Sequence, residues 1–272
     1  MELQPAYADG LLTCEVREGV CHLGLNDAEH MNAFSLPLVF GIHEAVRAAL
    51  DAGHRRFVLF GHGDDFSAGA NLVDYQRSVA AITQGDGFAE FYESERALLD
   101  LARLLRSPDV LSVASCQGWV IGQALEVIMA CDFVVAAPGA TFWLPESRWG
   151  WNVGMGTTYL LAHTIGIGWT RRMLLLNEKL PAERAEQLGL VARVGELGSN
   201  RELATSLLDE MAKAAPRALQ SLKKLIDVLP ATSLDDSREL ELVNAYWLAH
   251  TRDVLEGATS FVERRPPVFR GS

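Results

Sequence analysis

The sequence is short of basic residues and lacks any long hydrophobic run. Lysine and arginine number 24 against 35 aspartates and glutamates, so the formal net charge of the 272 residues is −11. Nucleic acids and anionic membranes bind through basic surfaces, and neither is expected as a partner. The stretch 110–125, which has no charged residue, includes two serines and two glutamines. It is also shorter than the roughly 20 apolar residues that a membrane helix needs, so no membrane association is expected.

Cysteine is scarce. The four cysteines form no CxxC pair, and a chain of this length does not need disulfides to build a stable core. The first ten residues, MELQPAYADG, have neither the basic nor the apolar region of a secretory signal. These features predict a reduced, cytoplasmic location.

Several catalytic motifs are also absent. The sequence has no GxSxG serine-hydrolase elbow, and its seven histidines show no HExxH or other metal-ligand spacing. The run GMGTT at 154–158 lacks the third glycine of a dinucleotide fingerprint, and no GKS or GKT follows a glycine loop. We therefore expect no metal, and no nucleotide phosphate bound by these mechanisms.

The apolar pattern predicts alternating strands and helices, which is typical of α/β architecture. A hairpin is expected at 11–15 and 20–25, and a helix that Ser35 caps should end near Gly53. Further along, the pattern predicts strands at 57–60, 111–115 and 133–137 and helices at 88–105 and 123–130. From Thr157 onward it predicts mainly helices, at 157–165, 170–176, 182–188, 200–214, 217–229 and 234–264. We assign an α/β core to residues 1–200 and a helical region to 201–272.

Two glutamates lie among apolar residues. Glu126 is within the segment GQALEVIM at 122–129, and Glu146 follows FWLP at 142–145. An unpaired buried charge is costly, so each side chain faces solvent, an ion-pair partner or a polar cavity. If both face one cavity, burial and mutual repulsion raise a pKa and supply an acid and a base. Composition does not decide between these alternatives.

Five segments resemble motifs of one enzyme superfamily, in the same order. They are HMNAFS at 30–35, FSAGANL at 66–72, QGWVIGQALE at 117–126 followed by Cys131 and Asp132, FWLPE at 142–146 followed by Gly150, Gly154 and Gly156, and FVERRPP at 261–267. Each motif alone is weak, but together they resemble the crotonase superfamily of enoyl-CoA hydratases and isomerases. The resemblance implies an α/β fold built as a spiral of repeated ββα turns, with a C-terminal helical trimerisation layer.

The resemblance also assigns catalytic roles. Hydratases of this family use two glutamates twenty residues apart, and Glu126 and Glu146 have that spacing. By analogy, Glu126 activates the water that attacks C3 and Glu146 exchanges a proton at C2. The thioester oxygen is implied to lie between the backbone N–H groups of Ala70 and Gln123. Fixed donors of this kind stabilise enolate charge, and each contributes about 10²–10³ in rate.

The implied ligand is an acyl-coenzyme A thioester, which is the substrate, with no separate cofactor. Its phosphates need cations, and the candidates are His30, Arg264 and Arg265, although the arginines could equally be a solvated basic end. Family members are trimers or dimers of trimers, so a homotrimer or hexamer is expected. The residues implied to bind substrate or coenzyme are His30, Asn32, Ala33, Ala68, Asn71, Leu72, Trp119, Trp143, Trp149, Gly154, Phe261 and Arg264.

The chain departs from the family pattern at several positions. Gln123 and Ala124 replace two glycines of a G-G-G run, Asn71 replaces the usual acid, and Val153 replaces a proline. Gln123 keeps its N–H donor but narrows the approach of the thioester. Four tryptophans, which either pack in the core or shape a pocket for an aromatic or branched acyl group, are Trp119, Trp143, Trp149 and Trp151.

These features predict reversible hydration of a 2-enoyl-CoA thioester. The nearest alternative is another enolate reaction on a CoA or carrier-protein thioester: isomerisation, retro-aldol or retro-Claisen cleavage, dehydration or decarboxylation. The pair Glu126 and Glu146 favours hydration, because relatives with other activities often keep one glutamate or neither. A third hypothesis is a non-catalytic binding or assembly subunit whose oxyanion loops are closed by Gln123.

Overall fold

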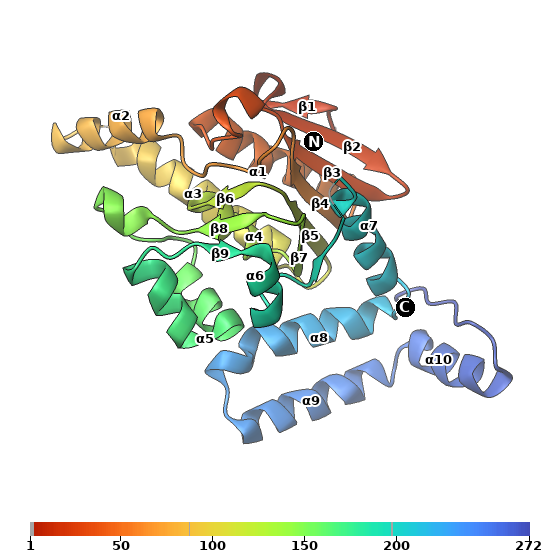
Figure 1. Ribbon diagram of the computed structural model, residues 1–272. Coiled ribbons are helices and arrows are strands. Elements are labelled where there is room, and N and C mark those ends of the chain that lie inside the picture. The colour runs from red at the N-terminus through yellow and green to blue at the C-terminus, as the bar shows by residue number, and fades with distance from the viewer. Residues whose placement is uncertain (1–2, 87, 197) are drawn as a thin grey trace. The chain divides into compact units, whose positions relative to one another are not determined.

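A computed structural model describes residues 3–86, 88–196 and 198–272 (Figure 1). The chain divides into two compact units. The first comprises residues 1–106 and 110–206, and the second comprises 107–109 and 207–272. The predicted boundary after residue 200 falls at the start of α7 (Asn200–Met211).

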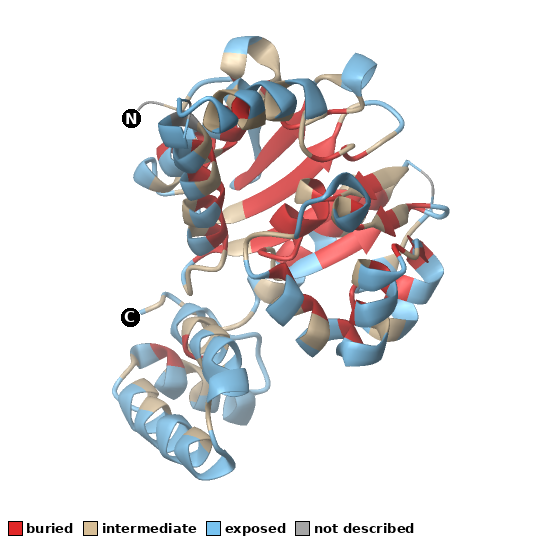
Figure 2. Ribbon diagram, turned by 90° about the vertical axis from the view of Figure 1, so that its left-hand side faces the viewer, coloured by how far each residue is buried: buried red, intermediate tan, exposed pale blue. Residues whose placement is uncertain are grey.

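A seven-stranded sheet forms the centre of the first unit. Its strands are β1 (Ala6–Tyr7), β2 (Leu12–Arg17), β3 (Val20–Leu25), β4 (Arg56–Gly61), β5 (Leu111–Cys116), β7 (Phe133–Ala136) and β10 (Arg193–Val194), in this spatial order. β1, β2 and β3 pair antiparallel, and β3, β4, β5, β7 and β10 run parallel. Most of the parallel part is red in Figure 2, the colour of buried residues. Parallel sheets are covered on both faces, which explains their continuous apolar strands.

Local sequence signals explain the first elements of this unit. Glu18 and Gly19, with φ of 50° and 75°, join β2 to β3, because a tight hairpin turn requires positive φ at both central residues. Helix α1 (Leu36–Asp51) begins where the Ser35 hydroxyl accepts a hydrogen bond from the Leu38 N–H. The predicted hairpin and first helix are therefore confirmed.

A second, three-stranded sheet was not predicted. β6 (Trp119–Ile121) and β8 (Thr141–Trp143) run parallel, and β9 (Leu180–Pro181) pairs antiparallel with β8. Strands of two or three residues are too short to show an alternating pattern. Ile121 pairs with Trp143 in this sheet, so the segments that lead to Gln123 and Glu146 lie side by side.

The remaining helices of the first unit differ in part from prediction. They are α2 (Leu72–Thr83), α3 (Phe88–Leu105), α4 (Gln123–Ile128), α5 (Thr157–Leu175) and α6 (Ala182–Leu188). α2 was missed; only Ser78 is buried among its residues, so its apolar side chains do not form a stripe that packs in the core. The two segments predicted at 157–165 and 170–176 form α5, which is interrupted by non-helical backbone at Gly166.

The second unit contains the end of α7, α8 (Pro216–Val228), α9 (Leu234–Leu248) and α10 (Arg252–Glu263). The single helix predicted at 234–264 is wrong, because the Thr251 hydroxyl accepts from the Val254 N–H and starts α10 as a new helix. Asp253 accepts hydrogen bonds from the N–H groups of Arg270 and Gly271, which attach the C-terminal residues to α10. Across the described residues, no helix is long and apolar enough to cross a membrane.

Candidate active site

The two segments that carry the predicted oxyanion donors meet at Gly69. Gly69 has a φ of 81°, and a side-chain carbon there would collide with the Ile121 carbonyl and lie 3.3 Å from the Gln123 nitrogen. Only glycine permits this close contact. Within the described ranges, neither the Ala70 N–H nor the Gln123 N–H has a hydrogen-bond acceptor. Both donors are therefore available to a ligand.

Ala70 and Gln123 line a cavity of about 230 Å³, which also exposes Glu146. Its wall is mostly apolar, with several large aromatic side chains. Pockets for small molecules commonly combine such a wall with a few polar groups. The lining residues are Ala68, Ala70, Leu72, Tyr75, Ile121, Gly122, Gln123, Trp143, Pro145, Glu146, Trp149 and Trp151.

Glu126 lies on α4, one turn after Gln123, and is 6% exposed. Its Oε1 accepts a hydrogen bond of 2.9 Å from the Gly154 N–H. The pKa of Glu126 is raised to about 7, mainly by burial; the hydrogen bond from Gly154 opposes the shift, and the negative charges of Glu146 and Glu95 add to it. A carboxyl with this pKa can both take and give a proton near neutral pH.

Glu146 begins the short helix η3 (Glu146–Trp149), directly after β8 and Pro145. Its Oε2 is buried and has no hydrogen-bond partner among the described residues. A side-chain carbon on Gly122, whose φ is 54°, would lie 2.7 Å from its Oε1. Burial raises the pKa of Glu146. The predicted pair of carboxyls thus flanks the segment that carries Gln123.

Glu95 on α3 is a third carboxyl of this region, which the sequence analysis missed. A side-chain carbon on Gly154 would lie 3.1 Å from Oε2 of Glu126 and 3.8 Å from Oε2 of Glu95. Burial raises the pKa of Glu95. One signal was present: Glu95 occupies the same helical stripe as Phe91 and Leu98, where an apolar residue is expected.

Comparisons with known proteins identify the family. Residues 15–272 match the family model for enoyl-CoA hydratase/isomerase. The chain belongs to the enoyl-CoA hydratase/isomerase family. The predicted superfamily is thus confirmed, and the chain is an enzyme of this family.

Individual relatives resemble the chain along nearly its whole length. A protein of Mycobacterium tuberculosis named as a probable enoyl-CoA hydratase is 32% identical over 255 residues, which cover 94% of this chain and 97% of that protein. The 2,3-dehydroadipyl-CoA hydratase of Escherichia coli is 30% identical over 256 residues, with coverage of 94% and 96%. The crystal structure of an enoyl-CoA hydratase from Polaromonas sp. JS666 has a TM-score of 0.87 at 26% identity and covers 95% of this chain and 99% of that one. These likenesses confirm the predicted α/β crotonase fold.

The residues of the HMNAFS motif, at 30–35, do not line the 230 Å³ cavity. Asn32 is 0% exposed, and its amide donates hydrogen bonds to the carbonyls of His62, Asp65 and Phe66. It therefore holds the loop that precedes Ala68, and any effect on substrate acts through that loop. The side chain of His30 is 69% exposed, and Ala33 is half-buried.

His30 lies 2.8 Å from Asp27, and this hydrogen bond raises the pKa of the imidazole. A raised pKa favours the charged imidazolium, which is the form that attracts a phosphate. Asn71, another predicted binding residue, caps α2 by accepting hydrogen bonds from the N–H groups of Val73 and Asp74.

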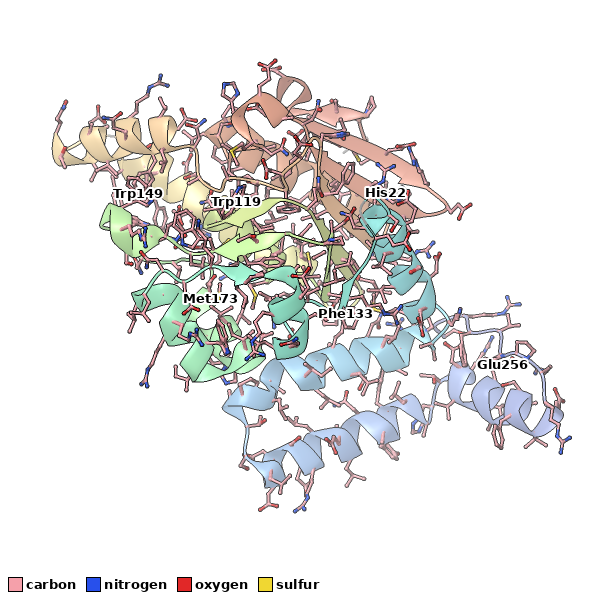
Figure 3. All side chains as sticks on the ribbon, in the orientation of Figure 1. His22, Trp119, Phe133, Trp149, Met173 and Glu256 are labelled. Atoms are coloured by element: carbon pink, nitrogen blue, oxygen red, sulfur yellow. The ribbon has the colours of Figure 1, made fainter. Side chains whose placement is uncertain are left out.

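The predicted tryptophans take different positions (Figure 3). Trp143 and Trp149 line the cavity, as does Trp151. Trp119 on β6 does not line it and contacts Trp143 at 6.3 Å between ring centroids, and the Lys179 ammonium lies 4.7 Å from the Trp119 ring centroid. The tryptophan cluster is therefore partly pocket wall and partly packing.

Phe261 and Arg264 belong to the second unit, at the end of α10. Both are exposed. Their contact with a coenzyme A substrate stays a prediction.

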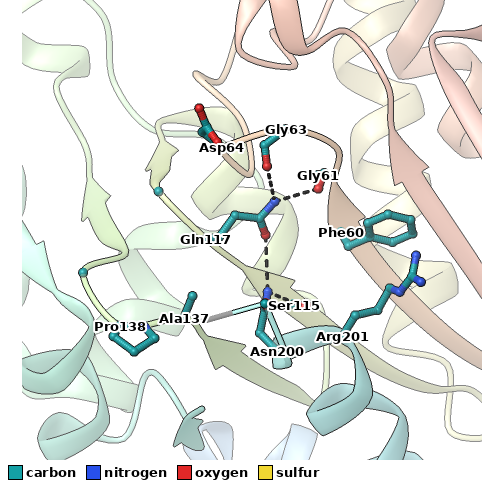
Figure 4. A pocket seen from close by; sticks show the side chains of 13 residues that line it. Phe60, Gly61, Gly63, Asp64, Ser115, Gln117, Ala137, Pro138, Asn200 and Arg201 are labelled. Atoms are coloured by element: carbon teal, nitrogen blue, oxygen red, sulfur yellow. Dashed lines mark hydrogen bonds between the residues drawn. The ribbon is translucent and has the colours of Figure 1, made fainter. Parts of the chain in front are cut away.

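A larger cavity of about 550 Å³ lies at the carboxyl ends of β4, β5 and β7 (Figure 4). None of the described residues that line it is a predicted site residue. The Gln117 amide donates to the Gly61 carbonyl at 2.6 Å, and the Asn200 amide donates to the Ser115 hydroxyl at 2.8 Å and to Gln117 Oε1 at 3.3 Å. These side chains connect loops of the fold.

Proposed function

We propose that this enzyme adds water reversibly across the C2=C3 double bond of a 2-enoyl-CoA thioester. The observation that carries the proposal is the position of two carboxyls on either side of Gln123. Glu146 is half-buried and lines the cavity with Ala70 and Gln123, whose N–H groups have no acceptor among the described residues, and the buried Glu126 lies one turn after Gln123 on α4. Isomerisation requires a single proton carrier, so the presence of both carboxyls favours hydration.

The reaction begins when the thioester carbonyl oxygen accepts hydrogen bonds from Ala70 and Gln123. Glu126, as a carboxylate, removes a proton from water while the oxygen attacks C3. The electron pair of the double bond moves towards the carbonyl, and the two fixed donors stabilise the resulting enolate oxygen. Glu146, as a carboxylic acid, then protonates C2 and releases a 3-hydroxyacyl thioester.

The raised pKa values of the two carboxyls support the presence of one acid and one base in this site. Two adjacent buried carboxyls do not easily carry two negative charges, so near neutral pH they share a proton and titrate as a pair. One member is then available as a base while the other is available as an acid. After each turnover, proton transfer through water restores the starting state.

The assembly that we propose is a homotrimer or a dimer of trimers. Exposed apolar side chains on α9 and α10, among them Leu242, Tyr246 and Phe261, support it, because large exposed apolar surfaces mark protein interfaces. Light scattering tests this proposal, and a monomer would contradict it.

The decisive experiment is a panel of short, branched and aromatic 2-enoyl-CoA thioesters. Hydration removes the conjugated absorbance and adds the mass of one water to the thioester. We expect at least one member to be hydrated by the wild-type chain and not by Glu126→Gln. If the wild-type chain hydrates none of them, the proposed function is wrong.

A further inference from the structure

A second, smaller cavity adjoins the proposed catalytic cavity. It measures about 40 Å³ and shares Ala70, Tyr75 and Gln123 with the larger one. Because Ala70 and Gln123 would hold the thioester oxygen, a group in the small cavity belongs to the acyl part of the substrate. A single water occupies about 30 Å³ of the liquid. The small cavity therefore has room for about one small substituent.

Tyr75 lines both the small cavity and the 230 Å³ cavity, and its ring ends in a hydroxyl group. It is buried, and no hydrogen bond to it is found within the part of the chain that the structure describes. Trp151 and Phe91 pack against the ring edge-on, at 5.1 and 6.4 Å between centroids. The ring is thus held from two sides, and its hydroxyl cannot turn to solvent without breaking these contacts.

Glu95 also lines the small cavity, together with the polar residues Asn71, Asp74, Ser78 and Ser94. It forms no hydrogen bond or ion pair with the described residues, although it is half-buried. Much of the surrounding wall is apolar, with Phe34, Val39 and Leu98. Buried polar groups are usually paired, and an apolar acyl chain in this cavity would leave both Tyr75 and Glu95 unpaired.

We propose that Tyr75 and Glu95 together bind a hydroxyl group on the acyl chain, beyond the reacting double bond. A hydroxyl accepts a hydrogen bond from the Tyr75 O–H and donates one to the Glu95 carboxyl, which satisfies both groups at once. The enzyme would then prefer hydroxylated 2-enoyl-CoA substrates. This inference rests on the proposed function, because it assumes that an acyl thioester occupies the 230 Å³ catalytic cavity.

Two other substituents fit less well. A carboxylate on the acyl chain would approach Glu95, Glu126 and Glu146 without a basic side chain among the described residues of either cavity wall. Like charges at this distance repel one another. A trimethylammonium group would find aromatic rings and a carboxylate, but it is too large for about 40 Å³.

The test measures binding, which does not depend on turnover. Hexanoyl-CoA and its 4-, 5- and 6-hydroxy derivatives are titrated into the wild-type chain by calorimetry. We expect at least one hydroxylated thioester to bind about tenfold more tightly than hexanoyl-CoA, because a site built around a hydroxyl rejects the analogue that lacks it. The variants Tyr75→Phe and Glu95→Leu should reduce this preference, and Glu95→Gln, which keeps an acceptor oxygen, should restore part of it.

Matched controls come from exposed positions on α3, the helix that carries Glu95. Tyr92→Phe and Glu93→Leu should leave the preference unchanged, because both side chains are exposed on α3. The inference is overturned if no hydroxylated thioester binds better, if a trimethylammonium derivative binds best, or if the controls lose the preference as much as Tyr75→Phe does. Should Glu95→Leu fail to fold, Tyr75→Phe alone still decides.

Activity on crotonyl-CoA separates this inference from the function on which it rests. A chain that hydrates crotonyl-CoA but shows no preference for a hydroxyl overturns the inference and leaves the function intact. A chain that shows the preference, sensitive to Tyr75→Phe, but hydrates no thioester overturns the function instead.

Discussion

The catalytic cavity and the cavity at the strand ends differ in how their polar side chains are paired. In the cavity at the strand ends, of about 550 Å³, the side-chain amides of Gln117 and Asn200 form hydrogen bonds with each other and with neighbouring residues. In the catalytic cavity, of about 230 Å³, Glu146 Oε2 and Tyr75 Oη have no partner among the described residues. Buried polar groups without partners are rare in folded proteins and call for an explanation. A bound ligand that pairs with Glu146 and Tyr75 is such an explanation, and the larger volume of the other cavity does not supply one.

The largest effect that this comparison predicts is the loss of activity in Glu126→Gln and Glu146→Gln. Glutamine has the same shape, and at 126 its oxygen can still accept the hydrogen bond from Gly154, but it neither takes nor gives a proton. We expect kcat to fall by about 10²–10⁴ in each variant. The measurement is the rate of absorbance loss with the best enoyl-CoA substrate.

The exposed Glu93→Gln on α3 is the control for these variants and should keep full activity. If either site variant kept more than a tenth of the wild-type kcat, that carboxyl would not be a proton carrier, and the comparison between the two cavities would lose its main support.

The sequence was sufficient to predict the residues that short motifs hold in place. Ala70, Gln123, Glu126 and Glu146 lie within or beside glycine-containing loops, and only a few chain conformations satisfy such loops. The separation of Glu126 and Glu146 along the chain was informative because β6 and β8, the strands that precede them, pair Ile121 with Trp143. This register could not be read from two three-residue strands, and the resemblance to a family supplied it instead.

Glu95 and Tyr75 could not be predicted, because their meeting depends on tertiary packing. They lie on α3 and α2, and the sequence pattern did not reveal α2 at all. Tyr75 viewed alone fits an ordinary helix surface, and the position of Glu95 in an apolar stripe does not show which residue it meets. Only the approach of both helices to Ala70 and Gln123 encloses them.

The large cavity should respond to substitution through stability and not through catalysis. Replacing Asn200 by Ala removes the donor to the Ser115 hydroxyl on β5 and to Gln117, which directly follows β5. We expect the free energy of unfolding to fall by about 1–3 kcal/mol, with kcat unchanged. Urea unfolding followed by circular dichroism measures the first quantity, and the enoyl-CoA assay measures the second.

Gln187→Ala is the matched control for Asn200→Ala, since its amide is exposed on α6. It should leave stability within about 0.5 kcal/mol of the wild type. A loss of activity in Asn200→Ala with normal stability would mean that the large cavity is part of the reaction.

The pH dependence of stability offers an effect that is specific to the catalytic carboxyls. Folding raises the pKa of Glu126 from an ordinary value of 4.5 to about 7. Below the lower value both states are protonated, and as pH rises the unfolded chain loses its proton first. The contribution of Glu126 to stability is therefore complete in acid and is lost by pH 7, a change of up to about 3 kcal/mol.

Unfolding by urea at a series of pH values between these limits measures this slope, and Glu126→Gln should reduce it because glutamine does not titrate. Glu93→Gln should retain the slope. If Glu126→Gln retained it as well, the raised pKa would not belong to Glu126.

The smallest expected effect is that of Gln123→Gly, which tests whether the oxyanion donor or the side chain matters at this position. Glycine keeps the backbone N–H and removes a side chain that lines both the catalytic and the small cavity. At the first residue of α4 it costs at most about 1 kcal/mol of helix stability. We expect kcat for a short enoyl thioester to stay within about threefold of wild type, and KM for an aromatic thioester to fall, because backbone without a side chain allows closer approach of the ligand. A fall in kcat as large as that of Glu126→Gln would instead place the Gln123 side chain itself in the reaction, and the unpaired N–H groups would then no longer explain why this cavity differs from the one at the strand ends.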